Sequence, residues 1–139
     1  MKLSTYLNFP GTCAEALEFY AKHLGARIVV KFGFDTMPEP KHIPPGLENG
    51  VLHARFELGG TVVMASDGPA ERVQPMRSAY MSLSVESSAE AERIYAVLKE
   101  RGEVFMPLEE TFFAHRFAQL RDKFGINWMI LHERAPAQS

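Results

Sequence analysis

The feature that most constrains the fold of this 139-residue chain is a helix-start signal that occurs twice. Thr12 stands three residues before Glu15. Ser87 stands three residues before Glu90, 75 positions further along the chain. A hydroxyl residue followed three positions later by glutamate is a capping box, in which both side chains satisfy backbone N–H groups at a helix start. The sequence therefore predicts two helices in two copies of one supersecondary unit.

Further signals follow the same order in each half of the chain. Apolar residues at helical spacing follow each start, and a glycine, Gly25 or Gly102, is expected to end each helix. These glycines differ by 77 positions, which implies a two-residue insertion in the second helix. Alternating or β-branched stretches predict strands over residues 3–9, 26–34, 50–58, 61–66, 79–86, 103–108, 113–121 and 126–132. This order predicts an α+β fold of two βαβββ modules, residues 3–66 and 79–132.

The segments between these elements are predicted to be loops and turns. Residues 35–50 contain four prolines and two glycines and are too interrupted for regular structure. Residues 67–78, with Gly68, Pro69 and Pro75, are expected to link the two modules. Hairpin turns are predicted at Gly59-Gly60 and at residues 122–125.

Composition excludes several classes of partner and location. The 15 basic and 17 acidic side chains give a formal net charge of −2, which argues against nucleic acid or an anionic membrane as the main partner. The single cysteine, Cys13, excludes an intrachain disulfide and fits a reducing compartment. Polar residues interrupt the N-terminal segment, and no stretch approaches the ~20 apolar residues of a membrane helix. We expect a cytoplasmic protein.

Several segments resemble a known family. They are residues 6–9 (YLNF), 11–20 (GTCAEALEFY), 52–54 (LHA), 64–67 (MASD) and 116–128 (RFAQLRDKFGINW). They are similar to the PhnB-like branch of the vicinal oxygen chelate superfamily, which includes glyoxalase I, extradiol dioxygenases, and bleomycin- and fosfomycin-resistance proteins. The resemblance extends to His132 and departs at residues 113–115, Phe-Ala-His, where the branch usually has Trp-Gly-Asp. It implies that residues 1–139 form one glyoxalase-like domain, with eight strands in one curved mixed sheet around a cleft.

The resemblance also implies positions for a metal site. Metal-dependent members place four His or Glu ligands on the first and last strands of the two modules. Carried over to this chain, the positions are Thr5, Met64, Tyr80 and Met129. Hydroxyl and thioether groups are poor ligands for zinc, nickel or iron. We therefore expect the metal site of the superfamily to be absent, and no cofactor.

A displaced metal site is the alternative. His53 and Glu57 lie on one face of a predicted strand, and His115 could approach from the other module. The other interpretation is that these are solvated or hydrogen-bonded strand residues.

The alternation of side chains between the two faces of each predicted strand predicts a small-molecule site. The residues expected to line or border the cleft are Thr5, Leu7, Phe9, His53, Arg55, Glu57, Met64, Tyr80 and Met129. Apolar walls with a few polar groups are typical of ligand pockets. Arg55 and Tyr80 would suit a small anionic ligand with an apolar or unsaturated body. The alternative is an ion pair between Arg55 and Glu57.

Cys13 is expected at the first position of its helix, where the helix dipole favours a thiolate. No acid or histidine is placed by the sequence to act with it, so we expect a packing role.

We therefore predict a PhnB-like small-molecule-binding protein without the metal site of the superfamily. The alternatives are a metal-dependent lyase, isomerase or dioxygenase, and a resistance-type protein that sequesters a drug or metabolite. Exposed sheet edges and the resemblance lead us to expect a homodimer.

Overall fold

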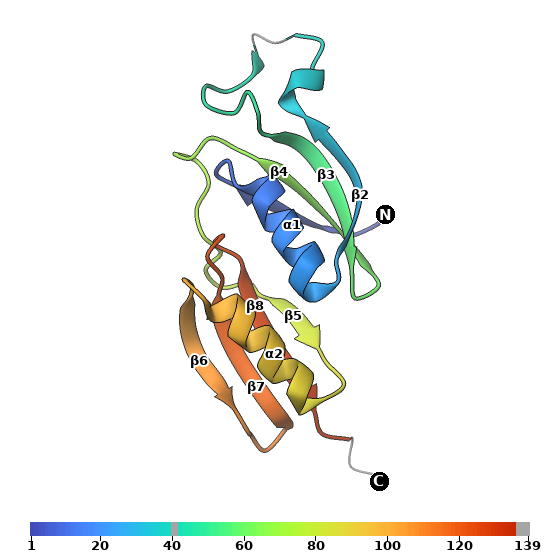
Figure 1. Ribbon diagram of the computed structural model, residues 1–139, viewed down its shortest axis with the longest axis vertical. Helices are drawn as coiled ribbons and strands as arrows, with labels where there is room; N and C mark the ends of the chain where they lie inside the picture. Colours follow the sequence, from blue (N-terminus) through green and yellow to red (C-terminus); the bar gives the residue numbers. More distant parts are fainter. Residues whose placement is uncertain (40–41, 136–139) are drawn as a thin grey trace. The chain divides into compact units, whose positions relative to one another are not determined.

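The computed structural model describes residues 1–39 and 42–135 (Figure 1). The chain divides into two compact units with the boundary between Gln74 and Pro75. We call residues 1–74 module 1 and the described residues from 75 onward module 2. In each module one helix covers one face of a four-stranded sheet (Figure 1). The predicted α+β fold of two βαβββ modules is confirmed.

Module 1 pairs its first and last strands in parallel. Its elements are β1 (Thr5–Phe9), α1 (Cys13–Leu24), β2 (Arg27–Gly33), the short 3-10 helix η1 (Phe34–Thr36), β3 (Val51–Leu58) and β4 (Thr61–Asp67). The strand order is β1-β4-β3-β2, and β4 is antiparallel to β3 and β3 to β2. Its core contains the fully buried side chains of Phe9, Leu17, Tyr20 and Phe56.

Module 2 repeats this topology. Its elements are β5 (Met81–Ser84), α2 (Ser88–Lys99), β6 (Glu103–Glu109), β7 (Ala114–Arg121) and β8 (Asn127–Glu133). The order is β5-β8-β7-β6, again with the first and last strands parallel. Trp128, Leu98 and Ile130 fill its core, and burying each such side chain contributes roughly 1.5–3 kcal/mol.

The expectation of one eight-stranded sheet is wrong. The strand pairing of the described residues gives two separate four-stranded sheets. The reason is that each strand forms its backbone hydrogen bonds with strands of its own module. For example, β1 pairs with β4, and β5 pairs with β8. A sequence repeat predicts that the strands pair in the same way in both modules. It contains no signal for pairing between strands of different modules.

The expected insertion in the second helix is also wrong. Both helices have 12 residues. Their first residues are 75 positions apart in the sequence, and so are their last residues. Gly25 ends α1 in the left-handed conformation as predicted, with φ 76°. In module 2 the helix stops at Lys99, and Arg101 takes the left-handed conformation. The two extra residues therefore follow the helix. Gly102 is required for another reason, because a Cβ there would collide with the Arg121 carbonyl oxygen.

Of the two predicted helix caps, one is confirmed. Ser87 is extended, and its Oγ accepts a hydrogen bond from the Glu90 N–H at 3.1 Å. Thr12 has φ −107° and ψ 13° and makes no side-chain cap bond. The Cys13 N–H instead donates to Asp67 Oδ1 at 2.9 Å, so a carboxylate from β4 satisfies the first turn of α1.

The predicted turns are confirmed, and the long loop is partly different. Gly59 and Gly60 both have positive φ, as the tight β3–β4 hairpin requires. In the turn at 122–125, Asp122 Oδ1 accepts from two backbone N–H groups. The segment 35–50 begins inside η1, so its first residues are helical. Residues 40–41 of this segment lie outside the described residues.

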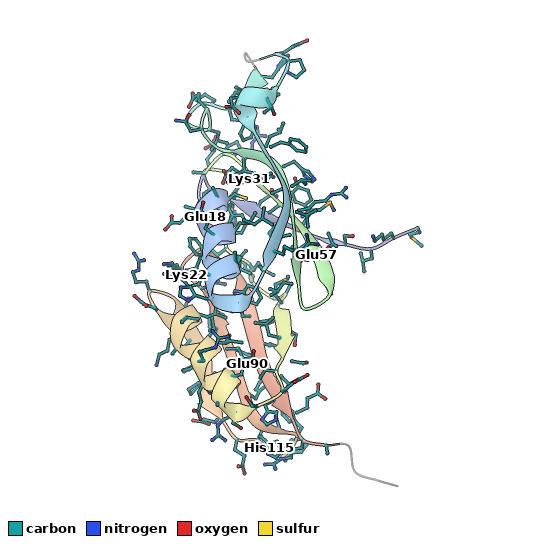
Figure 2. All side chains as sticks on the ribbon, turned by 45° about the vertical axis from the view of Figure 1, so that its right-hand side comes forward. Glu18, Lys22, Lys31, Glu57, Glu90 and His115 are labelled. Atoms are coloured by element: carbon teal, nitrogen blue, oxygen red, sulfur yellow. The ribbon has the colours of Figure 1, made fainter. Side chains whose placement is uncertain are left out.

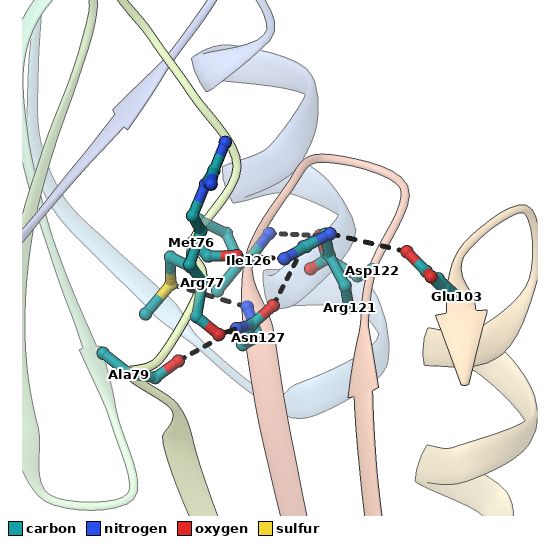
Figure 3. Close-up of polar contacts among 8 residues, drawn as sticks. All are labelled: Met76, Arg77, Ala79, Glu103, Arg121, Asp122, Ile126 and Asn127. Carbon is teal, nitrogen blue, oxygen red and sulfur yellow. Dashed lines mark hydrogen bonds and ion pairs between the residues drawn. The ribbon is translucent and has the colours of Figure 1, made fainter. Parts of the chain in front are cut away.

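The residues just before β5 are bound to the sheet of module 2 (Figure 3). The Asn127 side chain, which is fully buried, donates to the carbonyl oxygens of Arg77 and Ala79, each at 3.1 Å. Its Oδ1 accepts from Arg121 Nε, and Arg121 also donates to the Met76 carbonyl oxygen. Residues 76–79 are thus a fixed part of module 2, and we call them the 76–79 strap. They include the last three residues of the expected linker, 67–78.

Among the described residues, no helix is both long enough and apolar enough to cross a membrane.

Candidate functional site

The sheet of module 1 has one face under α1 and one face without a helix. The helix side carries Ala54, Phe56, Val63 and Ala65, all at most 1% exposed. Side chains alternate along each strand, and the pairing joins Arg55 to Met64 and Tyr6 to Met64. The opposite face, which we call the helix-free face, therefore carries Tyr6, Asn8, His53, Arg55, Glu57, Met64 and Ser66.

Strand β1 presents different residues to this face from those expected. Leu7 and Phe9 are 4% and 0% exposed and lie in the core on the α1 side. Thr5 pairs with Val63, on the same side as Leu7. Tyr6 takes the position on the helix-free face that the sequence analysis gave to Thr5. A shift of one residue moves every side chain of a strand to the other face of the sheet. The apolar side chains of Leu7 and Phe9 were the signal that the face of β1 with Thr5, Leu7 and Phe9 packs under α1.

Tyr6 and His53 are in contact across the sheet. Tyr6 Oη lies 3.2 Å from His53 Nδ1, and their ring centroids are 5.8 Å apart. Tyr6 belongs to β1 and His53 to β3, with β4 between these strands. Tyr6 was not among the predicted site residues, because no local sequence pattern joins residues 47 positions apart.

Arg55 and Glu57 are not paired with each other. Glu57 accepts from Arg27 of β2 at 2.7 Å, and it lies towards the hairpin end of β3 (Figure 2). Within the described part of the chain, the Arg55 guanidinium has no hydrogen-bond or ion-pair partner. The exposed guanidinium is therefore available to a ligand, next to Met64 of β4.

The remaining predicted residues lie in module 2. Met129 of β8 pairs with Ser82 of β5 and Gln119 of β7. Tyr80 is half-buried and directly precedes β5. His115 lies on β7, with Nδ1 3.3 Å from Arg134 Nη1 and its ring 4.8 Å from that of His132 (Figure 2).

The donor atoms do not fit the metal site that the superfamily implies. Tyr6 and Met64 stand side by side in module 1, and Ser82 and Met129 do so in module 2. Phenol, hydroxyl and thioether groups do not make a site for a divalent metal. Within the described residues of either module, no three His, Cys, Asp or Glu side chains are grouped as metal ligands.

Cys13 lies in a setting that opposes thiolate chemistry. The side chain is 0% exposed, at the start of α1. Burial, and secondly the negative charge of Asp67, raises the pKa of Cys13 to about 12, although Lys31 opposes the shift. The helix dipole is outweighed, and the thiol stays protonated at neutral pH.

Asp67 is a structural carboxylate that sequence analysis did not single out. Its two oxygens accept from the Cys13 N–H at 2.9 Å and the Val51 N–H at 2.8 Å. It therefore joins the start of α1 to the start of β3, the strand that carries His53 and Arg55. A hollow of about 210 Å³ lies nearby, lined by Ala14, Lys31, Gly33, Asp35, Asn49, Gly50 and Val51. No predicted site residue lines this hollow.

Comparison with known proteins identifies relatives over nearly the full chain. The sequence profile of the family described as the Glyoxalase/Bleomycin resistance protein/Dioxygenase superfamily matches residues 2–130. The protein YjdN of Escherichia coli (strain K12) is 32% identical in an alignment 138 positions long, which covers 94% of this chain and 94% of that one.

Two solved structures are similar over nearly the whole chain. Protein PA1353 from Pseudomonas aeruginosa superposes with a TM-score of 0.84 at 36% identity, covering 97% of this chain and 99% of that one. A Bacillus cereus protein described as a putative 3-demethylubiquinone-9 3-methyltransferase, PhnB protein, gives a TM-score of 0.82 at 28% identity. That match covers 95% of this chain and 99% of the other.

Proposed function

Because the chain belongs to the glyoxalase/bleomycin resistance protein/dioxygenase superfamily, in its PhnB-like branch, we propose that it binds a small anionic molecule. The binding surface is the helix-free face of module 1. The observation that carries this proposal is the unpaired Arg55 guanidinium beside the Tyr6–His53 pair. A guanidinium presents a planar fork of donors that matches a carboxylate or phosphate.

The surroundings of Arg55 favour a ligand with an apolar body. Tyr6 and Phe32 are 44% and 50% exposed, and Phe32 pairs with His53 in the β2–β3 register. Met64 adds a half-buried thioether next to Arg55. One fixed charge among exposed rings and a thioether suits an aromatic or unsaturated acid better than a bare inorganic anion.

The test is a binding screen of small carboxylates and phosphates on wild type and Arg55→Ala, read by thermal shift and then by titration. We expect hits to bind Arg55→Ala about ten- to a hundredfold more weakly, the loss of one charge-assisted contact. Arg55→Lys should restore only part of the affinity, because an ammonium cannot make two parallel bonds. Arg72→Ala removes another exposed arginine of module 1 and should bind like wild type. Equal weakening by both alanine variants, or no anion that binds, would refute the proposal.

The fate of the ligand separates the functional alternatives. Native mass spectrometry of the purified protein shows whether a small molecule is retained, and incubation with a hit shows whether it is returned unchanged. A ligand held unchanged supports a binding or sequestering role, and a product supports an enzyme. Stoichiometric metal in elemental analysis, located at His53 or His115, would favour the metal-dependent lyase, isomerase or dioxygenase.

We also propose a homodimer. Strand β6 is a sheet edge, and its Val104, Phe105 and Met106 are 39%, 37% and 44% exposed. Exposed apolar edges favour association with a second chain. Sedimentation at micromolar concentration should give twice the 15.6 kDa chain mass, and a monomer alone would count against this proposal.

A further inference from the structure

The Tyr6–His53 contact is a single polar interaction that spans three strands of module 1. Tyr6 Oη and His53 Nδ1 are 3.2 Å apart, and the two rings are tilted by 35°. The neighbouring polar pair on this face is separate, because the Ser66 hydroxyl donates to Asn8 Oδ1 at 3.0 Å. Among the described residues, the Tyr6 hydroxyl is the one side-chain hydrogen-bond partner of the His53 imidazole.

This contact has a consequence for the proton on His53. A neutral imidazole has one nitrogen that donates and one that accepts. A phenol carries one proton and donates it readily to an imidazole nitrogen. When Tyr6 donates to Nδ1, that nitrogen is unprotonated, and Nε2 must carry the hydrogen.

We propose that Tyr6 is a positioning residue that holds His53 as the Nε2–H tautomer, so that β3 presents two N–H donors to the ligand. The donors are His53 and Arg55, which lie two residues apart and therefore roughly 7 Å apart along the strand. Such a pair recognises an acid that carries a second, uncharged oxygen acceptor set back from its carboxylate. This inference rests on the proposed function, whose anion it describes more closely.

The tautomer is measured without any ligand. Protein labelled with ¹⁵N-histidine is examined at pH 8 by long-range ¹H–¹⁵N correlation, and the His53 signals are assigned with His53→Gln. We expect the Nε2–H form in wild type and a mixture of tautomers in Tyr6→Phe, which keeps the ring and removes the hydroxyl. His132, with Nδ1 3.1 Å from Ser88 Oγ in module 2, is the internal control and should not change. An Nδ1–H form in wild type, or no change in Tyr6→Phe, would overturn the assignment.

Recognition is measured with two matched acids, 3-benzoylpropionate and 4-phenylbutyrate, which differ by one carbonyl oxygen. We expect wild type to bind the oxo acid about five- to tenfold more tightly, the effect of one neutral hydrogen bond. Tyr6→Phe should lower this ratio by about twofold, because the oxo acid must then select the Nε2–H form from a mixture of tautomers. Arg55→Ala should weaken both acids and keep the ratio. Equal affinities in wild type would refute the recognition half alone. If neither acid binds while another anion of the screen does, the recognition half is refuted. If no anion binds, the anion site itself is contradicted, and the NMR result still decides the role of Tyr6.

Discussion

Modules 1 and 2 have the same strand order and the same helix length, yet they begin their helices with different chemistry. In module 2 the cap is local, because Ser87 accepts from Glu90 three residues later. In module 1 the corresponding Thr12 makes no cap bond, and Asp67 supplies the acceptor from 54 positions away. A repeated sequence signal therefore predicts that a helix starts without settling which atoms satisfy its first N–H groups.

The two buried carboxylates extend the comparison. Asp67, 5% exposed, joins the helix and the third strand of module 1. Asp122, 3% exposed, closes its own turn and accepts from the Trp128 indole N–H at 2.8 Å. One carboxylate acts between distant elements and the other within one hairpin, although the two modules have the same sheet topology.

The largest effect is expected from Asp67→Ala. Two buried backbone N–H groups would lose a charged acceptor, so the free energy of unfolding should fall by about 3 kcal/mol or more. Urea unfolding measures the change, with the exposed Asp35→Ala as the control that should stay within about 0.5 kcal/mol of wild type. A loss below about 1 kcal/mol would mean that module 1 does not depend on its distant cap.

Asn127→Ala in module 2 should be next. It removes three hydrogen bonds of a fully buried amide and releases the 76–79 strap, at a cost of about 2 kcal/mol. Trypsin should then cut after Arg77 much faster than in wild type, as shown by mass spectrometry of the fragments. The control Asn49→Ala, at an exposed residue, should leave the cleavage rate as it is. Rapid cleavage after Arg77 already in wild type would contradict the conclusion that the 76–79 strap is held to module 2.

The helix caps give the direct test of the comparison. Ser87→Ala should lower the free energy of unfolding by about 1 kcal/mol, because α2 loses its side-chain cap. Thr12→Val should cost less than about 0.5 kcal/mol or should stabilise, because Thr12 Oγ1 is buried without a hydrogen-bond partner among the described residues. Thermal and urea unfolding of both variants measure the difference. Equal losses would remove the distinction between the two helix starts.

The effect that is smallest at neutral pH concerns the titration of Cys13. The folded pKa of about 12 lies above the ordinary 9.0, so the unfolded state releases the thiol proton first. The contribution of Cys13 to stability is complete below pH 9 and is lost as the pH rises towards 12. The stability difference between wild type and Cys13→Ala should therefore be constant up to about pH 8 and decline above pH 9. A constant difference up to pH 10.5 would contradict the raised pKa.

Local patterns explain most of what the sequence predicted correctly. The Ser87 cap, the left-handed Gly25 and the Gly59-Gly60 turn each depend on residues within a few positions of one another. The order of helix and strands along each half of the chain follows from the same short-range signals, repeated twice. They could not supply contacts between distant positions, such as Asp67 with Cys13 or Tyr6 with His53.

The face of β1 shows a second limit of the sequence analysis. Metal positions carried over from the family began at Thr5, whereas Leu7 and Phe9 pack under α1. The alternation of apolar and polar residues in β1 itself was the better guide. Whether the eight strands join in one sheet depends on contacts between modules, for which a repeat inside one chain contains no information.

The distant origin of the α1 cap has a consequence for the order of folding. Thr5 and Val63 are 58 positions apart and Met81 and Trp128 are 47 apart, so closing the two parallel pairs differs by only about 0.2 kcal/mol of chain entropy. Loop length therefore does not decide which module forms first. Helix α2 can form its cap as soon as its first turn exists, whereas α1 must wait until β4 brings Asp67 to Cys13. Ser87→Ala is then expected to slow refolding, and Asp67→Ala mainly to speed unfolding.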